Sequence, residues 1–315
     1  MTQPFDPIDL NEIRTHALAE RDSQVSASEF AGTWDKGQTF SDFISKLPDI
    51  LAGRDLKTVV QKIAAAFRGN KTVALGMGAH VIKVGLNPVV INLMERGIIS
   101  AVAMNGAGII HDLEIALTGR TSEDVAAALE DGSFGMVRET SEFLSAAINK
   151  AEEKSMGLGE AVGRAILENN LPFVEHSILA AGSRIGIPVT VHVAIGTDIL
   201  HMHPGFDPKA AGGATHRDFR TFASVIAALE GGVYLNVGSA VILPEVFLKA
   251  VALARNLGYR LENFTTVNMD FIRHYRPLTN VVNRPTGQGG QGINLVGHHE
   301  IMLPLIAAGV IEQLT

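Results

Sequence analysis

Short apolar runs alternate with amphipathic stretches from residue 72 to the end of the chain. The runs that predict strands are TVALGMG (72–78), IISAVAMNG (98–106), GIPVTVHVAI (186–195), GGVYLNVGSAV (231–241), NFTTVNM (263–269) and GINLV (292–296). Stretches with apolar residues at spacings of three and four lie between and after them, and these predict helices. They are NPVVINLMERG (87–97), IIHDLEIALTG (109–119), DFRTFASVIAALEG (218–231), LPEVFLKAVALARNLG (243–258) and HEIMLPLIAAGVIEQL (299–314).

This alternation is typical of strands that are buried on both faces and joined by helical crossovers. We therefore predict an α/β fold built on a doubly wound, mainly parallel, Rossmann-like sheet of six strands. Residues 121–170 are expected to add two or three helices. Residues 1–70 form the other predicted unit, an N-terminal helical arm, because FSDFISKLPDILAG (40–53) and LKTVVQKIAAAFRG (56–69) have helical spacing. The α/β domain is expected to span 71–315.

Composition narrows the class of protein. The chain has 315 residues, no cysteine and a formal net charge of −7. Cysteine chemistry is therefore excluded, and the acidic balance argues against a protein that binds nucleic acid through its phosphates. No apolar stretch has the length of a membrane span or the character of a signal peptide. We expect a cytoplasmic protein that acts on a small molecule.

The predicted strands end in glycine-rich or polar turns. These turns are GMGAH (76–80), MNGAG (104–108), AIGTD (194–198), NVGSA (236–240) and NMDF (268–271). Glycine lets a backbone approach a ligand closely, and a helix that begins directly afterwards offers free N–H groups to an anion. Four glycine turns at one sheet edge favour a nucleotide-sized site, although such turns need glycine in any case. The usual G-x-G-x-x-G fingerprint of dinucleotide sites is missing.

Two later segments carry polar side chains that are candidates for binding. HMHPGFDPKAAGGATH (201–216) contains His201, His203, Asp207 and His216, which could ligate a metal or belong to a polar loop that contacts substrate. The long stretch 268–292 contains Arg273, Arg276 and Arg284. Arginines in a long loop can clamp a carboxylate or phosphate, or can lie on the surface without a ligand.

The segment ALGMGAHVIKVGLNPVVINLMERGIISAVAMNGAGIIHDLEIAL (74–117) resembles the core of the deoxyhypusine synthase superfamily. Its HDLE (111–114) is similar to the HDIE motif of the NAD-binding domain in arginine dihydrolase/ornithine cyclodeaminase proteins. The segments IGIPVTVHVAIGTDIL, GGVYLNVGSAVILPEVFLKA, TTVNMD and GHHEIMLPLI continue the resemblance in the same order, so it covers about 72–312.

The resemblance implies that the chain binds NAD and forms a homo-oligomer, a dimer or tetramer. Together with the glycine turns, it implies cofactor contacts at Gly78, Ala79, His80, Asn105, Gly106, Ala107, Gly108, Gly238, Ser239, Met269, Asp270, His298 and His299. Asp198 falls at an acidic position that faces a substrate amine.

The sequence differs from the synthases at the positions that carry their catalytic and polyamine-binding residues. Ile110 and His111 stand where the synthases have two glutamates that hold a polyamine, and Pro244-Glu245 replaces a histidine pair. No lysine occurs in 271–296, where the synthases carry the one that forms an imine. Lys83 could substitute for it, but its position is also that of an ordinary helix lysine. We therefore do not expect a typical deoxyhypusine synthase.

Our main hypothesis is an NAD-dependent enzyme that acts on a small amine or amino-acid-like metabolite. His111 would be the general acid or base because its ordinary pKa is near neutral, with Asp112 orienting a ribose or the imidazole. Asp198 would hold the amine, and the arginines with His201 and His203 would contact the rest of the substrate. The alternatives are a non-catalytic nucleotide-binding protein of the same fold and a metal-dependent hydrolase that uses His201, His203 and His216.

Overall fold

A computed structural model describes residues 5–314. Its centre is a six-stranded parallel sheet in the order β3-β2-β1-β4-β5-β6. The strands are β1 (Val73–Met77), β2 (Ala101–Asn105), β3 (Val189–His192), β4 (Val233–Val237), β5 (Thr265–Asp270) and β6 (Gln291–Val296). All six predicted strands are present, which confirms the doubly wound α/β fold. From β1 the chain adds β2 and β3 on one side of the sheet and then β4, β5 and β6 on the other. The switch point therefore lies between β1 and β4.

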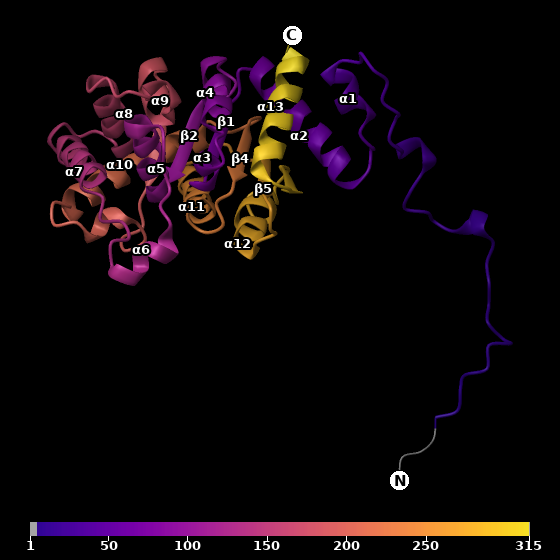
Figure 1. The fold of residues 1–315 in the computed structure, drawn as a ribbon. Helices are drawn as coiled ribbons and strands as arrows, with labels where there is room; N and C mark the ends of the chain where they lie inside the picture. Colours follow the sequence, from indigo (N-terminus) through magenta and orange to yellow (C-terminus); the bar gives the residue numbers. More distant parts are fainter. Residues whose placement is uncertain (1–4, 315) are drawn as a thin grey trace.

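Helices cover both faces of the sheet (Figure 1). On one face lie α2 (Leu51–Arg68), α4 (Asn87–Glu95), α5 (Gly106–Thr118), α9 (Ile178–Ile185) and α13 (His299–Leu314), with the short α3 (His80–Lys83). On the other lie α10 (Pro208–Ala227) and α11 (Ile242–Asn256), with α12 (Tyr275–Pro277) and the π-helical turn Leu278–Asn283. At the β3 edge of the sheet, α8 (Leu158–Glu168) packs on β3, and α7 (Arg138–Glu153) packs on α8.

The two faces of the sheet differ in chemistry because side chains alternate along each strand. The α5 face is aliphatic, with Leu75, Met104 and Leu235 in the larger core. The α11 face carries small and polar residues, among them an in-register row of asparagines. Asn236 donates to Asn268, and Asn268 donates to Asn294, each over 2.8 Å. These bonds join β4, β5 and β6 through side chains as well as backbone.

Side chains of α10 cover the outer edge of β3. Asp218 accepts from the N–H groups of Val191 on the strand (2.8 Å) and Gly159 at the start of α8 (2.9 Å). Thr215 accepts from the N–H of Val193 and donates to the carbonyl of Val191. Backbone groups that an edge strand would leave open are thereby paired. Burial raises the pKa of Asp218 to about 7, against the opposing effect of these hydrogen bonds.

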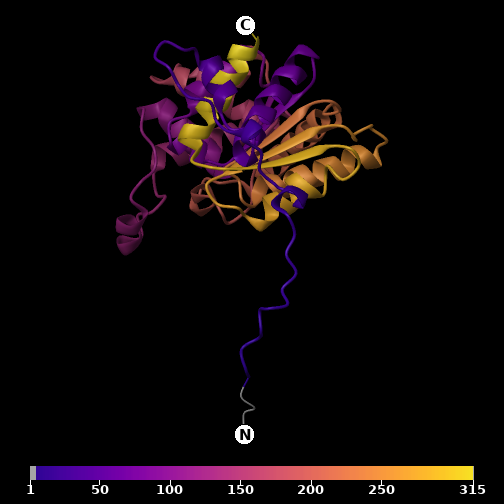
Figure 2. The same ribbon diagram turned by 90° about the vertical axis from the view of Figure 1, so that its right-hand side faces the viewer.

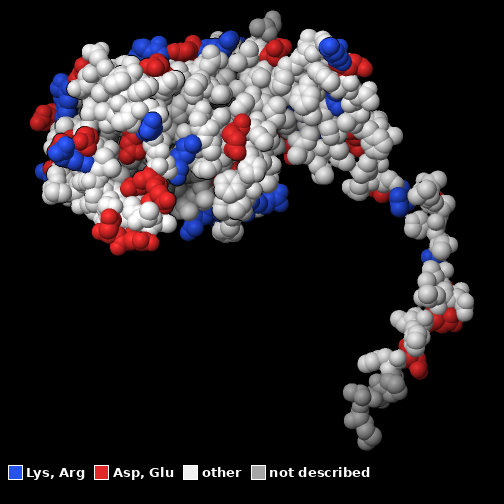
Figure 3. Space-filling model, viewed as in Figure 1, with Lys and Arg blue, Asp and Glu red and all other residues white. Residues whose placement is uncertain are grey.

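The N-terminal region is less helical than the pattern predicts. Helix occurs in α1 (Phe40–Lys46) and α2, while residues 5–39 hold only two 3-10 turns, Leu18–Glu20 and Ala27–Glu29. α2 packs against α13 and β6 as part of the α/β body. The segment before α1 leaves the body and extends away from it (Figures 1 and 2). It has scattered charges and mostly uncharged side chains (Figure 3).

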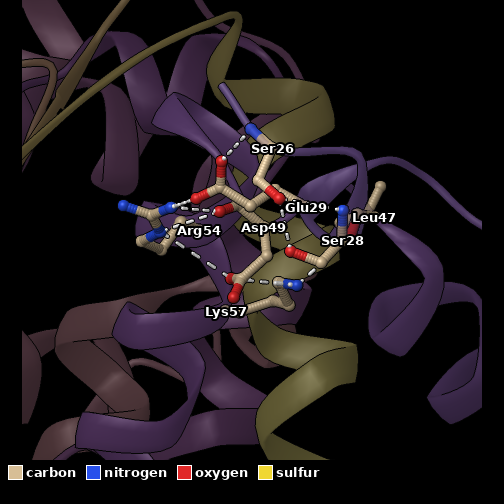
Figure 4. A network of polar contacts seen from close by, with 7 residues as sticks. All are labelled: Ser26, Ser28, Glu29, Leu47, Asp49, Arg54 and Lys57. Carbon is tan, nitrogen blue, oxygen red and sulfur yellow. Dashed lines mark hydrogen bonds and ion pairs between the residues drawn. The ribbon is translucent and has the colours of Figure 1, made fainter. Parts of the chain in front are cut away.

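A polar network fixes the base of this arm to the start of α2 (Figure 4). The guanidinium of Arg54 donates to Glu29 and to the carbonyl of Asp49. The backbone N–H of Asp49 donates to the carbonyl of Glu29 over 2.8 Å. Lys57 pairs with the Asp49 carboxylate at 3.2 Å. The arm is therefore held near residue 29, and the residues before it extend from that point.

Between α5 and α7 the chain forms an excursion with the short α6 (Val125–Asp131), which has no buried residue and stands away from the body (Figure 2). Acidic side chains gather over it (Figure 3). With α7 and α8 it makes three helices in 121–170, where two or three are expected. Among residues 5–314, no helix is long and apolar enough to cross a membrane.

Candidate functional site

Two glycine turns touch at the switch point of the sheet. The N–H of Gly78, directly after β1, donates to the carbonyl of Val237 over 2.9 Å. A Cβ atom on Gly78 would lie 2.1 Å from the carbonyl oxygen of Gly238, directly after β4. Such an atom has no room, so the close approach of these two backbones requires glycine at 78.

His299 lies beside Gly238 and is the most deeply buried imidazole of this edge. Gly238 has φ +65°, and a Cβ there would lie 3.0 Å from Nε2 of His299. His299 is 0% exposed, and neither ring nitrogen has a hydrogen-bond partner in the described structure. Its Nε2 lies 3.7 Å from Asp270, and its ring centroid is 5.5 Å from that of His80. Burial lowers the pKa of His299, which favours a neutral ring with unused hydrogen-bonding capacity at the switch point.

The other residues predicted at this edge have varied surroundings. His298 is exposed and stacks on Phe271. Ser239 is buried, and its hydroxyl accepts from the N–H of Leu243 in the first turn of α11. Met269 is 1% exposed and belongs to the aliphatic core, so only its backbone is near the edge. Ala79 is the half-buried N-cap residue of α3.

The turn after β2 begins α5. Oδ1 of Asn105 accepts from the N–H of Gly108 over 3.1 Å and caps the helix. A Cβ on Gly106 would lie 2.0 Å from Oδ2 of Asp198, which places that carboxylate against the first turn of α5. Oδ2 of Asp198 is buried without a partner in the described structure, and burial raises the pKa of this group. An ammonium group of a ligand would supply the missing partner.

A cleft of about 630 Å³ runs along α5 from this carboxylate. The exposed face of α5 forms its floor, and the excursion 120–137, the start of α7 and the loop 197–199 form its walls. Its lining is mainly apolar, with Ile110, Leu117, Phe134 and Val137 among the residues. The polar and charged residues that line it are Lys83, His111, Glu114, Thr118, Arg120, Thr121, Ser122, Glu123, Glu139, Thr140, Thr197 and Asp198. A concave site whose surface is mostly apolar, with polar groups placed around it, is the usual form of a small-molecule site.

His111 reaches this cleft as part of a hydrogen-bond chain. Its Nδ1 lies 2.6 Å from Oγ1 of Thr121, and Oγ1 lies 2.5 Å from Oε2 of Glu114. Thr140 donates to the other oxygen of Glu114 over 3.4 Å. Burial raises the pKa of Glu114, but hydrogen bonds and the charge of His111 outweigh it, so the pKa lies below its ordinary value. Glu114 is therefore an ionised partner for Thr121.

Asp112 lies next to His111 in sequence but on a different face of α5. It is 0% exposed. Its carboxylate accepts from the hydroxyl of Ser177 (2.5 Å) and from the N–H groups of Ile178 (2.8 Å) and Leu179 (3.2 Å). These bonds cap α9, and Asn87 donates to the same carboxylate. The structure thus gives Asp112 a place in the packing of α5 on α9 and does not bring it to the cleft or to the ring of His111.

The three arginines of 268–292 do not line one site, although Arg276 and Arg284 are linked through Glu245 and Asn280. Arg276 lies 3.5 Å from Glu245 on α11, and Arg284 donates to Asn280 within the π-helical turn. Arg273 lies in the exposed segment between β5 and α12. None of the three lines the cleft along α5.

The histidines after β3 have separate partners. Nδ1 of His201 accepts from the N–H groups of Gly196 (3.1 Å) and Asp198 (3.3 Å), so this ring orders the loop that carries Asp198. His203 bonds to the carbonyl of Gly135, and Asp207 caps α10. His216 lies near Phe219. Within residues 5–314, no three His, Asp or Glu side chains lie close enough to hold a metal ion.

Sequence reasoning did not assign a role to Glu114 or Thr121. His111 and Glu114 are three residues apart in a helix and therefore share a face, which is a usable signal. Thr121 has no such signal, because it meets His111 only after the chain reverses at the end of α5. Gly119, with φ +70°, makes that reversal.

Comparisons with known proteins identify the fold. No protein-family model matches the sequence, and no curated protein matches it. The structure is similar to that of AgrE in complex with ornithine and NAD+, with a TM-score of 0.52 and 14% identity over 84% of this chain and 34% of that one. The chain thus spans about a third of the length of AgrE.

Two other solved structures share the fold. A conserved putative LOR/SDH protein from Methanococcus maripaludis S2 matches with a TM-score of 0.51 and 15% identity, over 89% of this chain and 72% of that one. A putative deoxyhypusine synthase from Entamoeba histolytica matches with a TM-score of 0.50 and 11% identity, over 90% and 96%. The chain therefore has the deoxyhypusine synthase-like α/β fold, as the resemblance of its motifs predicts.

Proposed function

We propose that this protein is an NAD-dependent enzyme that acts on a small amine or amino-acid-like metabolite. One observation carries the proposal. Asp198 and the ring of His111 both line the cleft along α5, which begins at the glycine turn after β2, and Oδ2 of Asp198, buried against Gly106, has no hydrogen-bond partner among the described residues. The site thus offers an anion for an amine, a titratable base and an apolar wall.

The residues at the switch point fit a dinucleotide. Gly78 and Gly238 let the backbones that follow β1 and β4 approach closely at the switch point, next to the ring of His299. His299 provides two ring nitrogens without a partner in the described structure. When bound, NAD would supply a hydride acceptor. The solved AgrE complex contains ornithine and NAD+, and this agrees with the proposed cofactor and substrate class.

The roles of the chain's own residues follow from their positions. Asp198 would bind the substrate amine, because it lines the cleft and its Oδ2 has no hydrogen-bond partner among the described residues. His111 would take or return a proton at the substrate, since its ring lines the cleft and an imidazole is the commonest general acid or base. Ile110 and Phe134 would exclude water from the substrate's aliphatic part.

Calorimetric titration of the full chain with NAD tests the cofactor. Absorbance at 340 nm with a panel of amines and amino acids, ornithine included, then tests turnover. We expect NAD to bind, at least one amino-acid-like compound to be turned over, and His111→Asn to lower the rate by about 10²–10⁴-fold. His216→Asn, at a histidine outside the cleft, is the matched control. Failure of NAD to bind would contradict the proposal.

The second candidate is a nucleotide-binding protein without catalysis. The absence of a lysine in 271–296 favours it, because relatives of this fold that form an imine need one. NAD binding without turnover of any compound in the panel would support this candidate over the first.

A further inference from the structure

His111, Thr121 and Glu114 form an ordered chain of hydrogen bonds at the wall of the cleft. The distances are 2.6 Å from Nδ1 of His111 to Oγ1 of Thr121 and 2.5 Å from that oxygen to Oε2 of Glu114. The side chains of His111 and Glu114 are each 18% exposed, so the chain is largely shielded from solvent. His111 and Glu114 lie 3.8 Å apart at their nearest polar atoms, too far for a direct hydrogen bond.

The direction of each bond follows from the number of protons available. An ionised carboxylate can only accept, and a threonine hydroxyl has one proton to donate. Thr121 must therefore give its proton to Glu114, whose pKa is held below its ordinary value by these hydrogen bonds and by His111 in spite of burial. Toward the ring, the hydroxyl oxygen of Thr121 can then only accept a hydrogen bond. Nδ1 of His111 must therefore be protonated and donate that bond.

We propose, on the basis of the function proposed above, that Thr121 is a positioning residue that sets the tautomer of His111. It holds the proton of the neutral ring on Nδ1 and leaves the lone pair of Nε2 free as the base. Nε2 has no hydrogen-bond partner among the described residues, while the ring lines the cleft. A proton taken from the substrate would bind to Nε2, and the resulting imidazolium would face the Glu114 carboxylate through the Thr121 hydroxyl.

The backbone places Thr121 opposite the helix face that carries its partners. The N–H of Gly119 donates to the carbonyl of Ile115, and its φ of +70° turns the chain back along α5. Thr118 fixes the turn, since its hydroxyl donates to the carbonyl of Glu114 and accepts from the N–H of Arg120. A Cβ on Gly119 would lie 3.0 Å from the ring of Phe173, so the turn is also packed from outside.

The other charged groups around the cleft come from separate elements. They are Lys83 on α3, Arg120 and Glu123 in the segment before α6, Glu139 on α7 and Asp198 after β3. Glu123 accepts from the N–H of Gly135, and Glu139 pairs with Arg138. Among the described residues, Thr121 alone is hydrogen-bonded to the ring of His111.

The tautomer can be measured by ¹⁵N NMR on the full chain labelled at histidine, at about pH 9, where a histidine with an ordinary pKa is neutral. Loss of one signal pair in His111→Asn assigns the ring. We expect the Nδ1–H form to predominate in the wild type and in Thr121→Ser, which keeps the hydroxyl. Thr121→Val removes it and should shift the population to the Nε2–H form.

Thr140→Val is the matched control, since Thr140 contacts the same carboxylate but does not contact His111. It should leave the Nδ1–H form predominant. A wild-type ring protonated on Nε2, or an unchanged tautomer in Thr121→Val, would overturn the proposal. The measurement needs neither NAD nor substrate, so its outcome is independent of the proposed function. Where turnover is found, Thr121→Val should lower kcat with little change in KM, and Thr121→Ser should restore it.

Discussion

The carboxylate of Asp198 rests against the backbone of Gly106 at the first turn of α5, so closely that a methyl group on Gly106 would come within 2.0 Å of Oδ2. Three segments thus depend on one contact, and the third of them is distant in sequence from the other two. These segments are the end of β2, the start of α5 and the loop after β3 that His201 orders. The size of residue 106 therefore limits where the proposed amine-binding group can lie.

We expect Gly106→Ala to lower the free energy of unfolding by about 1–3 kcal/mol, because the added methyl overpacks a buried contact. Urea denaturation measures it. Removing the clashing carboxylate should reduce the loss, so Gly106→Ala should cost less in an Asp198→Ala background. Gly212→Ala, in α10 with nothing within 4 Å of the added Cβ, is the control. Equal costs in both backgrounds would contradict this account of the contact.

Gly238→Ala tests the switch point. The substitution adds strain at φ +65° and places a methyl group 3.0 Å from Nε2 of His299. Gly258→Ala is the matched control, since Gly258 has φ +84° but open surroundings. Both should destabilise the fold by about 1 kcal/mol or more through backbone strain.

Only Gly238→Ala should weaken NAD binding in calorimetry, by about tenfold or more, which corresponds to about 1.4 kcal/mol. Wild-type affinity in Gly238→Ala would argue against a nucleotide at this edge.

Because of the buried carboxyl group of Asp218, we expect the free energy of unfolding to depend on pH. The pKa of this group is about 7 in the folded protein and near its ordinary value of 3.8 in the unfolded chain. Between these values the folded protein holds a proton that the unfolded chain has released, so stability falls as the pH rises. We expect Asp218→Asn to reduce this fall by about 1.4 kcal/mol per pH unit near pH 5–6, whatever its absolute stability. Urea denaturation across this range measures the slope, and an unchanged slope would mean that the hydrogen bonds of Asp218 outweigh its burial.

We expect the contacts of Arg54 to hold the base of the N-terminal arm on the α/β body. The pair of Arg54 with Glu29 is partly exposed, so Arg54→Ala should change global stability by only about 0.2–1 kcal/mol. It should nevertheless make residues 26–39 more accessible, and limited proteolysis should cut there faster while the α/β body stays intact. Arg138→Ala, which removes an exposed pair with Glu139, is the control. Equal cleavage in both variants would show that the network of Figure 4 does not hold the arm.

The sequence by itself determined the elements of the α/β body. Strands buried on both faces read as continuous apolar runs, and amphipathic helices repeat at 3.6 residues, so both signals are local. The prediction of a helical arm over 1–70 was less accurate, because the side chains of residues 5–39 are nearly all exposed and bury no apolar face that would stabilise a helix.

Only the tertiary structure decided which side chains share a site. Asp112 and His111 are adjacent in sequence, yet one helix step turns them by about 100°, so the first caps α9 and the second faces the cleft. The reverse holds for Thr121, which meets His111 because Gly119 turns the chain, and for Asp198, which meets Gly106 because β2 and β3 are neighbours. Periodicity fixes the face of each element, whereas contacts between elements depend on turns and strand order, which no local pattern encodes.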